Sequence, residues 1–65
     1  MPSLDDLWTT YLTAAEQAAS DRLNWRMVKG SVDEATIMFQ RYYASDRAKD
    51  AAYQAWVTAY RAAAR

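Results

Sequence analysis

The sequence predicts an all-α protein, a small helical bundle that forms a single domain over residues 1–65. The composition supports this fold class, because the chain of 65 residues contains one glycine and one proline, while 52% of it is apolar. Glycine and proline are the residues that most often interrupt helices. The spacing of apolar residues supports it too, because it follows the helical period over most of the chain. We expect three helices, at about residues 4–21, 32–44 and 46–64.

The first helix has the clearest pattern. Ser3 is a suitable N-cap, and Asp6 follows three residues later, as in a capping box. On a helical wheel of residues 4–20, every apolar side chain falls within one arc of about 160°. The pattern fails at Arg22 and Arg26, which would point into that arc. We therefore expect this helix to end near residue 22.

Residues 23–29 are expected to form a connector. Apolar and polar residues alternate from Leu23 to Met27, which is the period of an extended chain. An extra turn of helix and a short hairpin that turns at Gly30 are the alternatives. Gly30 suits the position just after a helix, and Ser31 with Glu34 forms a capping box for the next one.

From residue 32 onward the helical period returns in two apolar series. They are separated by the polar segment Ser45-Asp46-Arg47, so we expect a break at Ser45 and a third helix after it. Both series fall at nearly the same wheel angle. The alternative is therefore an αα-hairpin whose second helix runs over residues 32–64, about 50 Å at ~1.5 Å per residue. Three helices are favoured because so long a helix has no equally long partner in the chain.

The C-terminal helix has apolar residues on two sides, one aromatic and one of alanine, and the first helix can cover only one of them. A chain of this size gains only about 3–5 kcal/mol from its own core. We therefore expect a non-enzymatic protein–protein interaction or assembly module that forms a homo-oligomer or docks on a larger partner, as an adaptor, an inhibitor or a phage or complex assembly component does. The expected partner-binding residues are Tyr43, Tyr53, Trp56, Tyr60, Ala52, Ala55 and Ala59.

A second hypothesis is a small nucleic-acid-binding module. Arg22, Trp25, Arg26 and Lys29 combine three cations with an indole, which suits phosphate contact and base stacking. The alternative interpretation is that Trp25 anchors the connector in the core while the cations complement the C-terminal end of the first helix. We favour the latter, because eight Lys and Arg balance eight Asp and Glu, and a neutral chain attracts nucleic acid weakly.

Most other functions are not expected. The chain has no cysteine and no histidine, which removes disulfides, the usual zinc sites and the commonest catalytic base and nucleophile. The paired acids Asp5-Asp6 and Asp33-Glu34 are explained by the first turns of helices. We expect no enzyme activity, cofactor, metal or small-molecule substrate. With no membrane span and no secretory signal in the pattern, we expect a cytoplasmic protein without membrane contact.

Overall fold

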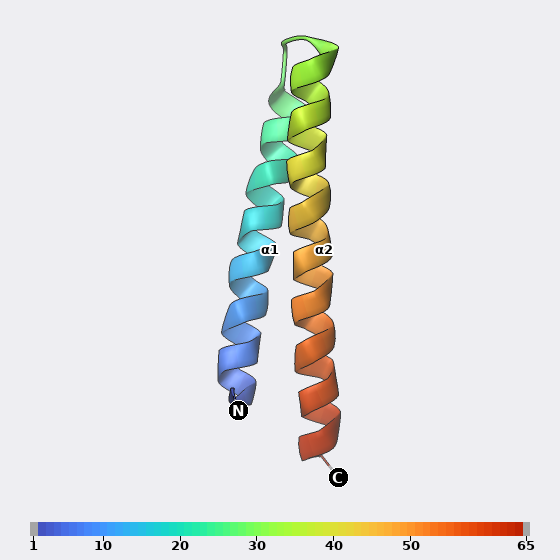
Figure 1. The fold of residues 1–65 in the computed structure, drawn as a ribbon. Helices are drawn as coiled ribbons and strands as arrows, with labels where there is room; N and C mark the ends of the chain where they lie inside the picture. Colours follow the sequence, from blue (N-terminus) through green and yellow to red (C-terminus); the bar gives the residue numbers. More distant parts are fainter. Residues whose placement is uncertain (1, 65) are drawn as a thin grey trace.

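The protein is an antiparallel helical hairpin. The computed structural model describes residues 2–64, which form α1 (Leu4–Met27) and α2 (Val32–Ala63). The helices run side by side in opposite directions, joined by a short loop at one end, with both termini at the other (Figure 1). The molecule measures 52 × 16 × 13 Å, and its radius of gyration is 15.0 Å, against about 11 Å for a compact domain of this length.

The alternative prediction, an αα-hairpin with one long second helix, fits this structure, and the favoured division into three helices does not. α2 passes through Ser45 without a break. The Ser45 hydroxyl donates to the Asp21 carboxylate on α1, and Lys49 pairs with Asp46 at 3.0 Å within α2. The polar segment that predicted a helix boundary is therefore a polar section of the contact between two helices.

α1 begins where the sequence predicts. The Ser3 hydroxyl accepts a hydrogen bond from the Asp6 amide at 3.1 Å, and the Asp6 carboxylate accepts one from the Ser3 amide at 3.3 Å. This reciprocal pair is a complete capping box, so two of the amides that lack helical partners at the N-terminus are satisfied.

The predicted end of α1 near residue 22 is wrong, because the helix continues to Met27. The side chains that face α2 recur every 3.5 residues, and such a stripe drifts by about 20° per seven residues on a wheel drawn at 3.6. Trp25 and Val28 continue this stripe. Arg22 and Arg26 lie beside it and are exposed, so they do not interrupt the contact.

The loop between the helices is shorter than the predicted connector. Val28 caps α1 with extended backbone, and Ser31 caps α2 by accepting a hydrogen bond from the Glu34 amide at 3.3 Å. The N-cap at Ser31 is thus confirmed, but the predicted capping box is incomplete, because the Ser31 amide makes no reciprocal hydrogen bond to the Glu34 carboxylate in the described part of the chain. Gly30 does not adopt a positive φ, so it does not serve as the left-handed glycine that often follows a helix.

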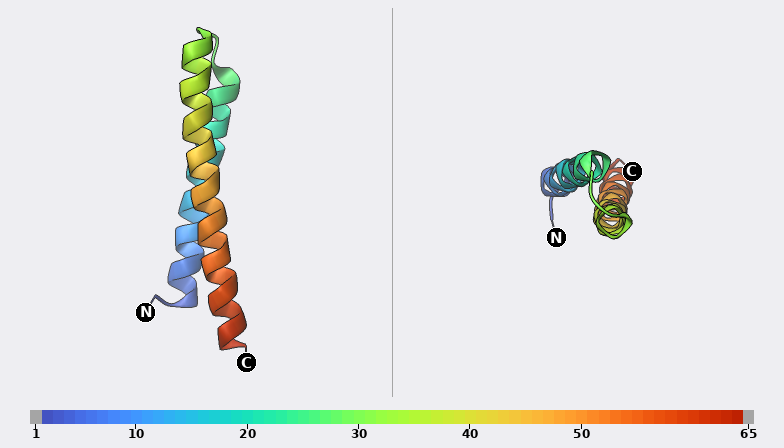
Figure 2. Two further views of the ribbon diagram at one scale, coloured as in Figure 1. Left: turned by 45° about the vertical axis from the view of Figure 1, so that its right-hand side comes forward. Right: turned by 90° about the horizontal axis from the view of Figure 1, so that it is seen from above.

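The two helices meet along a stripe with the spacing of a heptad repeat, which we call the seam. Its members are all partly or fully buried. They are Leu4, Leu7, Tyr11, Ala14, Ala18, Asp21 and Trp25 of α1, the cap residue Val28, and Ala35, Met38, Tyr42, Ser45, Lys49, Ala52, Trp56 and Ala59 of α2. Figure 2 shows the helices inclined to each other at a shallow angle, which suits such a stripe.

The hairpin has almost no enclosed core. Among the described residues only Ala18 is buried, with 4% of its surface exposed, and no large side chain is fully buried. Two helices can shield only one stripe of each other, so any other apolar side of either helix faces outward.

Candidate functional site

The nine aromatic side chains gather in two clusters at opposite ends of the hairpin. The terminal cluster, near the chain ends, comprises Trp8, Tyr11, Tyr53, Trp56 and Tyr60. The loop cluster comprises Trp25, Phe39, Tyr42 and Tyr43. Trp8 and Trp56 hold the helices together in the first, with ring centroids 4.9 Å apart, and Trp25 and Phe39 do so in the second at 5.2 Å.

One side of the hairpin is apolar on both helices, and we call it the open face. In an antiparallel coiled coil, the positions that follow the seam on the same side of each helix border one common surface. The apolar residues at these positions include Trp8, Leu12, Ala15 and Ala19 of α1 and Phe39, Tyr43, Tyr53 and Tyr60 of α2, and the charged residues Arg22, Asp46 and Asp50 occupy the same series of positions between them. The six large apolar side chains among them are 39–53% exposed. The apolar surface continues from one helix to the other.

A groove crosses the middle of the open face, between the two aromatic clusters. Its floor is lined by Ala15, Ala18 and Ala19, and aromatic rings of Tyr11 and Tyr42 stand at its two ends. Three charged side chains complete its walls: Arg22, Asp46 and Lys49. The groove exists because the seam narrows to small residues there, so the open face is hollow at its centre and built up at its ends.

The opposite side of the hairpin differs between the helices. On α2 it carries a row that we call the alanine flank, Ile37, Ala44, Ala48, Ala51, Ala55 and Ala62. The matching side of α1 presents polar residues, among them Thr10, Gln17 and Asn24. A second groove lies there near the chain ends, lined by Leu7, Ala55 and Ala62 together with Pro2 and other α2 residues. The apolar surface on this side therefore belongs mainly to α2.

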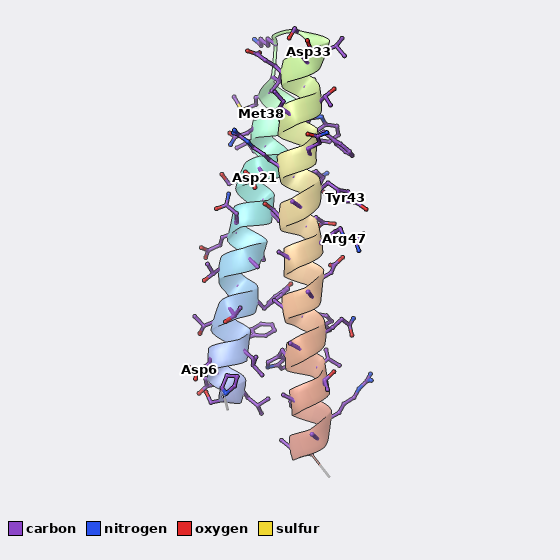
Figure 3. All side chains as sticks on the ribbon, viewed as in Figure 1. Asp6, Asp21, Asp33, Met38, Tyr43 and Arg47 are labelled. Atoms are coloured by element: carbon purple, nitrogen blue, oxygen red, sulfur yellow. The ribbon has the colours of Figure 1, made fainter. Side chains whose placement is uncertain are left out.

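Polar contacts in the seam set the charge of its middle section. Asp21 accepts hydrogen bonds from the Ser45 hydroxyl and from the Gln17 side-chain amide, the latter at 3.2 Å. These two bonds, the one from Ser45 most of all, hold the pKa of the Asp21 carboxyl below its ordinary value. The hydrogen bond to Asp46 raises the pKa of Lys49. Both groups keep their charge at neutral pH. Figure 3 shows Asp21 on the stretch of α1 that runs alongside α2.

The predicted partner-binding residues do not share one surface. Tyr43, Tyr53 and Tyr60 lie on the open face, and Tyr43 points outward from α2 beside Arg47 (Figure 3). The Arg47 guanidinium donates to the Tyr43 hydroxyl at 2.9 Å. The other four predicted residues lie elsewhere: Ala52, Trp56 and Ala59 belong to the seam and pack toward α1, and Ala55 lies on the alanine flank.

The predicted nucleic-acid cluster is also divided. Arg22, Arg26 and Lys29 are exposed near the loop end. The Trp25 ring instead stacks on Tyr42, with centroids 5.9 Å apart and planes 9° from parallel, and meets Phe39 edge-on. This arrangement matches the alternative interpretation, in which Trp25 anchors the end of α1.

Three large side chains of the open face are missed by sequence reasoning, namely Trp8, Leu12 and Phe39. Trp8 and Leu12 were assigned to the buried side of the first helix because they lie in its apolar arc. The missed signal is the width of that arc. Contact with one neighbouring helix needs only a narrow stripe, whereas an arc of about 160° has room for two neighbours.

The described residues show no cluster that could hold a metal ion. Residues 2–64 contain no group of three or more acidic side chains placed to hold a metal ion, and none of their polar side chains is buried. Neither described helix has an apolar stretch long enough to cross a membrane. Comparisons of the chain with protein-family models, curated proteins and solved structures found no match.

Proposed function

We propose that this chain is a non-enzymatic protein–protein interaction module that binds another helical chain through its open face. The bound chain is a second copy or a larger partner, as in an assembly component or an adaptor. The observation that carries the proposal is the open face itself, where six large apolar side chains are 39–53% exposed, whereas Ala18 is the only buried residue between positions 2 and 64.

The chemistry of the open face supports this function. Tryptophan, tyrosine and phenylalanine are the residues in which the centres of protein interfaces are enriched, and five of the six large side chains on the open face are of these types. The clusters also hold them in fixed positions. The Trp56 ring stacks on Tyr60 at 5.2 Å, and the Phe39 ring lies 6.3 Å from Tyr43, so little side-chain freedom is left to lose on binding.

The shape of the open face supports a helical partner. Ridges at its two ends and an alanine-lined groove at its centre are what a packed helix requires, because helices pack by placing large side chains into hollows between others. The predicted alanine surface of the C-terminal helix supports the proposal less strongly, because the matching side of α1 is polar.

Nucleic-acid binding is a weaker alternative. Arg22, Arg26 and Lys29 could contact phosphates, but Trp25 is engaged with Phe39 and Tyr42 and is not free to stack on a base. Titration of the chain with single-stranded and duplex DNA at low and high salt tests this alternative. Binding that weakens steeply with salt and is lost in the Arg22→Ala, Arg26→Ala double variant would favour it over protein binding.

The proposed function is tested with Leu12→Glu, which places a charge at the centre of the open face. The matched control is Thr13→Glu, on the exposed polar side of α1. Sedimentation of the isolated chain and affinity capture from the source organism are measured for both variants. We expect self-association or a captured protein that Thr13→Glu keeps and Leu12→Glu loses, with equal helix content by circular dichroism. No self-association at high micromolar concentration, together with no capture that distinguishes the variants, would contradict the proposal.

A further inference from the structure

The hairpin exposes more surface than a compact monomer of its mass. Its accessible surface is 5237 Å² at 7.4 kDa, whereas a compact monomer of that mass exposes about 4,200 Å². The excess is about 1,000 Å² per chain, which exceeds the ~800 Å² that each partner contributes to a standard interface. One further hairpin of the same size would cover such an excess.

The open face lies at the correct angle for a four-helix bundle. With 3.5 residues per turn, the open-face positions of each helix are centred about 100° from the seam. In a bundle of four helices each helix has two neighbours at roughly a right angle, and a second hairpin laid face to face supplies the missing neighbour for both helices. The open face would become the second half of the core.

We propose that the partner is a second copy of this chain, and that the two hairpins pack by their open faces with both loops at the same end. This inference rests on the proposed function and specifies its partner. A two-fold axis along the bundle then places α1 of each copy against α2 of the other at the same level.

The charges bordering the open face favour this orientation. Contacts across the seam, such as Trp8 with Trp56 and Asp21 with Ser45, fix which residues of α1 and α2 are level. By that alignment Arg22 comes within a turn of Asp46 of the second copy. The two pairs close into a ring of alternating charge at the centre of the bundle, beside the groove that both side chains line.

The other symmetric orientation, with loops at opposite ends, meets an electrostatic obstacle. It packs α2 against α2 of the second copy in the antiparallel direction. The midpoint of α2 lies between Asp46 and Asp50, so four carboxylates, two from each copy, would meet there. Like charges placed together in a closed interface repel each other and select against that arrangement.

A spin label at position 29 tests the proposal. The chain has no cysteine, so Lys29→Cys gives one label per chain in the loop at the end of the hairpin. We expect sedimentation to give a dimer and dipolar spectroscopy to give a separation of about 20 Å, set by the ~8–10 Å spacing of packed helices. A separation near the 52 Å length of the hairpin would overturn the orientation and leave the proposed function standing.

A second variant gives an independent outcome of opposite sign. Compared with Lys49→Gln, which breaks the same ion pair within each chain, Asp46→Asn removes an attraction when the loops share an end, and it relieves a repulsion when they do not. We expect the dimer dissociation constant to rise several-fold, and a fall would overturn the proposal. A folded chain that stays monomeric at high micromolar concentration would overturn it as well, and capture of a different protein that Leu12→Glu loses would then show that the proposed function survives alone.

Discussion

Replacing Trp56 with alanine should remove most of the stability of the isolated hairpin. Trp56 lies in the seam, and its ring contacts Trp8 at 4.9 Å and Tyr60 at 5.2 Å. A buried tryptophan removes roughly 150–250 Å² from water, worth about 4 kcal/mol at the lower bound. Unfolded chains already hide part of that area, so the expected loss is about 2–3 kcal/mol.

That loss is large compared with what a chain of this size can gain from its own core, about 3–5 kcal/mol. The assay is urea unfolding followed by far-ultraviolet circular dichroism, with every variant at the same protein concentration, chosen low enough that sedimentation shows no self-association. We expect Trp56→Ala to lose its cooperative transition or to shift it to much lower urea. Tyr60→Ala, whose side chain is 53% exposed, is the matched control and should cost less than about 1 kcal/mol.

Equal transitions for Trp56→Ala and the wild type would refute this reasoning. The result would mean that the terminal cluster does not hold the two helices together. It would also return Trp56 to the role that the sequence predicted for it, a residue whose main work is to bind a partner.

Three further predictions follow from polar and backbone features. Because the pKa of Asp21 is lowered, its contact with Ser45 should stabilise the hairpin above about pH 4, and this stability should be lost as pH falls through the folded-state pKa. In Asp21→Asn, the free energy of unfolding should therefore change less with pH over this acid range. Ser3→Ala removes the hydroxyl that caps α1 and should cost about 1 kcal/mol in urea unfolding, and an unchanged midpoint would mean that the helix end is frayed. Gly30→Ala should raise the melting temperature, because the backbone at Gly30 does not need a positive φ. A Cβ at this position would overlap the Glu34 carboxylate, but the exposed Glu34 side chain can turn away. We expect a gain in unfolding free energy of about 0.4–1 kcal/mol, and a loss would show that the loop needs glycine.

The start of each helix could be predicted from the sequence because the signals are local. Ser3 with Asp6 and Ser31 with Glu34 lie within four residues of each other, and a cap depends on little else. The all-helical fold could be predicted for the same reason, since propensity and spacing act over short stretches of chain.

The extent of the helices could not be predicted locally, because it depends on pairing between distant residues. Ser45 has the polar character of a helix boundary, and the hydrogen-bond partner that explains it within a helix, Asp21, lies 24 residues earlier in the chain. Arg22 interrupts the apolar arc of the first helix when that helix is considered alone. Only the position of the second helix shows which part of the arc makes the contact and which part is exposed. The same limit explains why Tyr53 was predicted on a binding surface but Leu12 was not.

The hydrogen bond between Asp21 and Ser45 also favours one alignment of the two helices. Near the middle of the seam the side chains are small, so steric fit alone specifies the alignment weakly there. A slide by seven residues would leave Asp21 facing Ala52 or Met38, neither of which can donate a hydrogen bond, and would strand a carboxylate between two helices. The Ser45 hydroxyl thus favours, at the middle of the hairpin, the same register that the short loop and the aromatic clusters favour at its two ends.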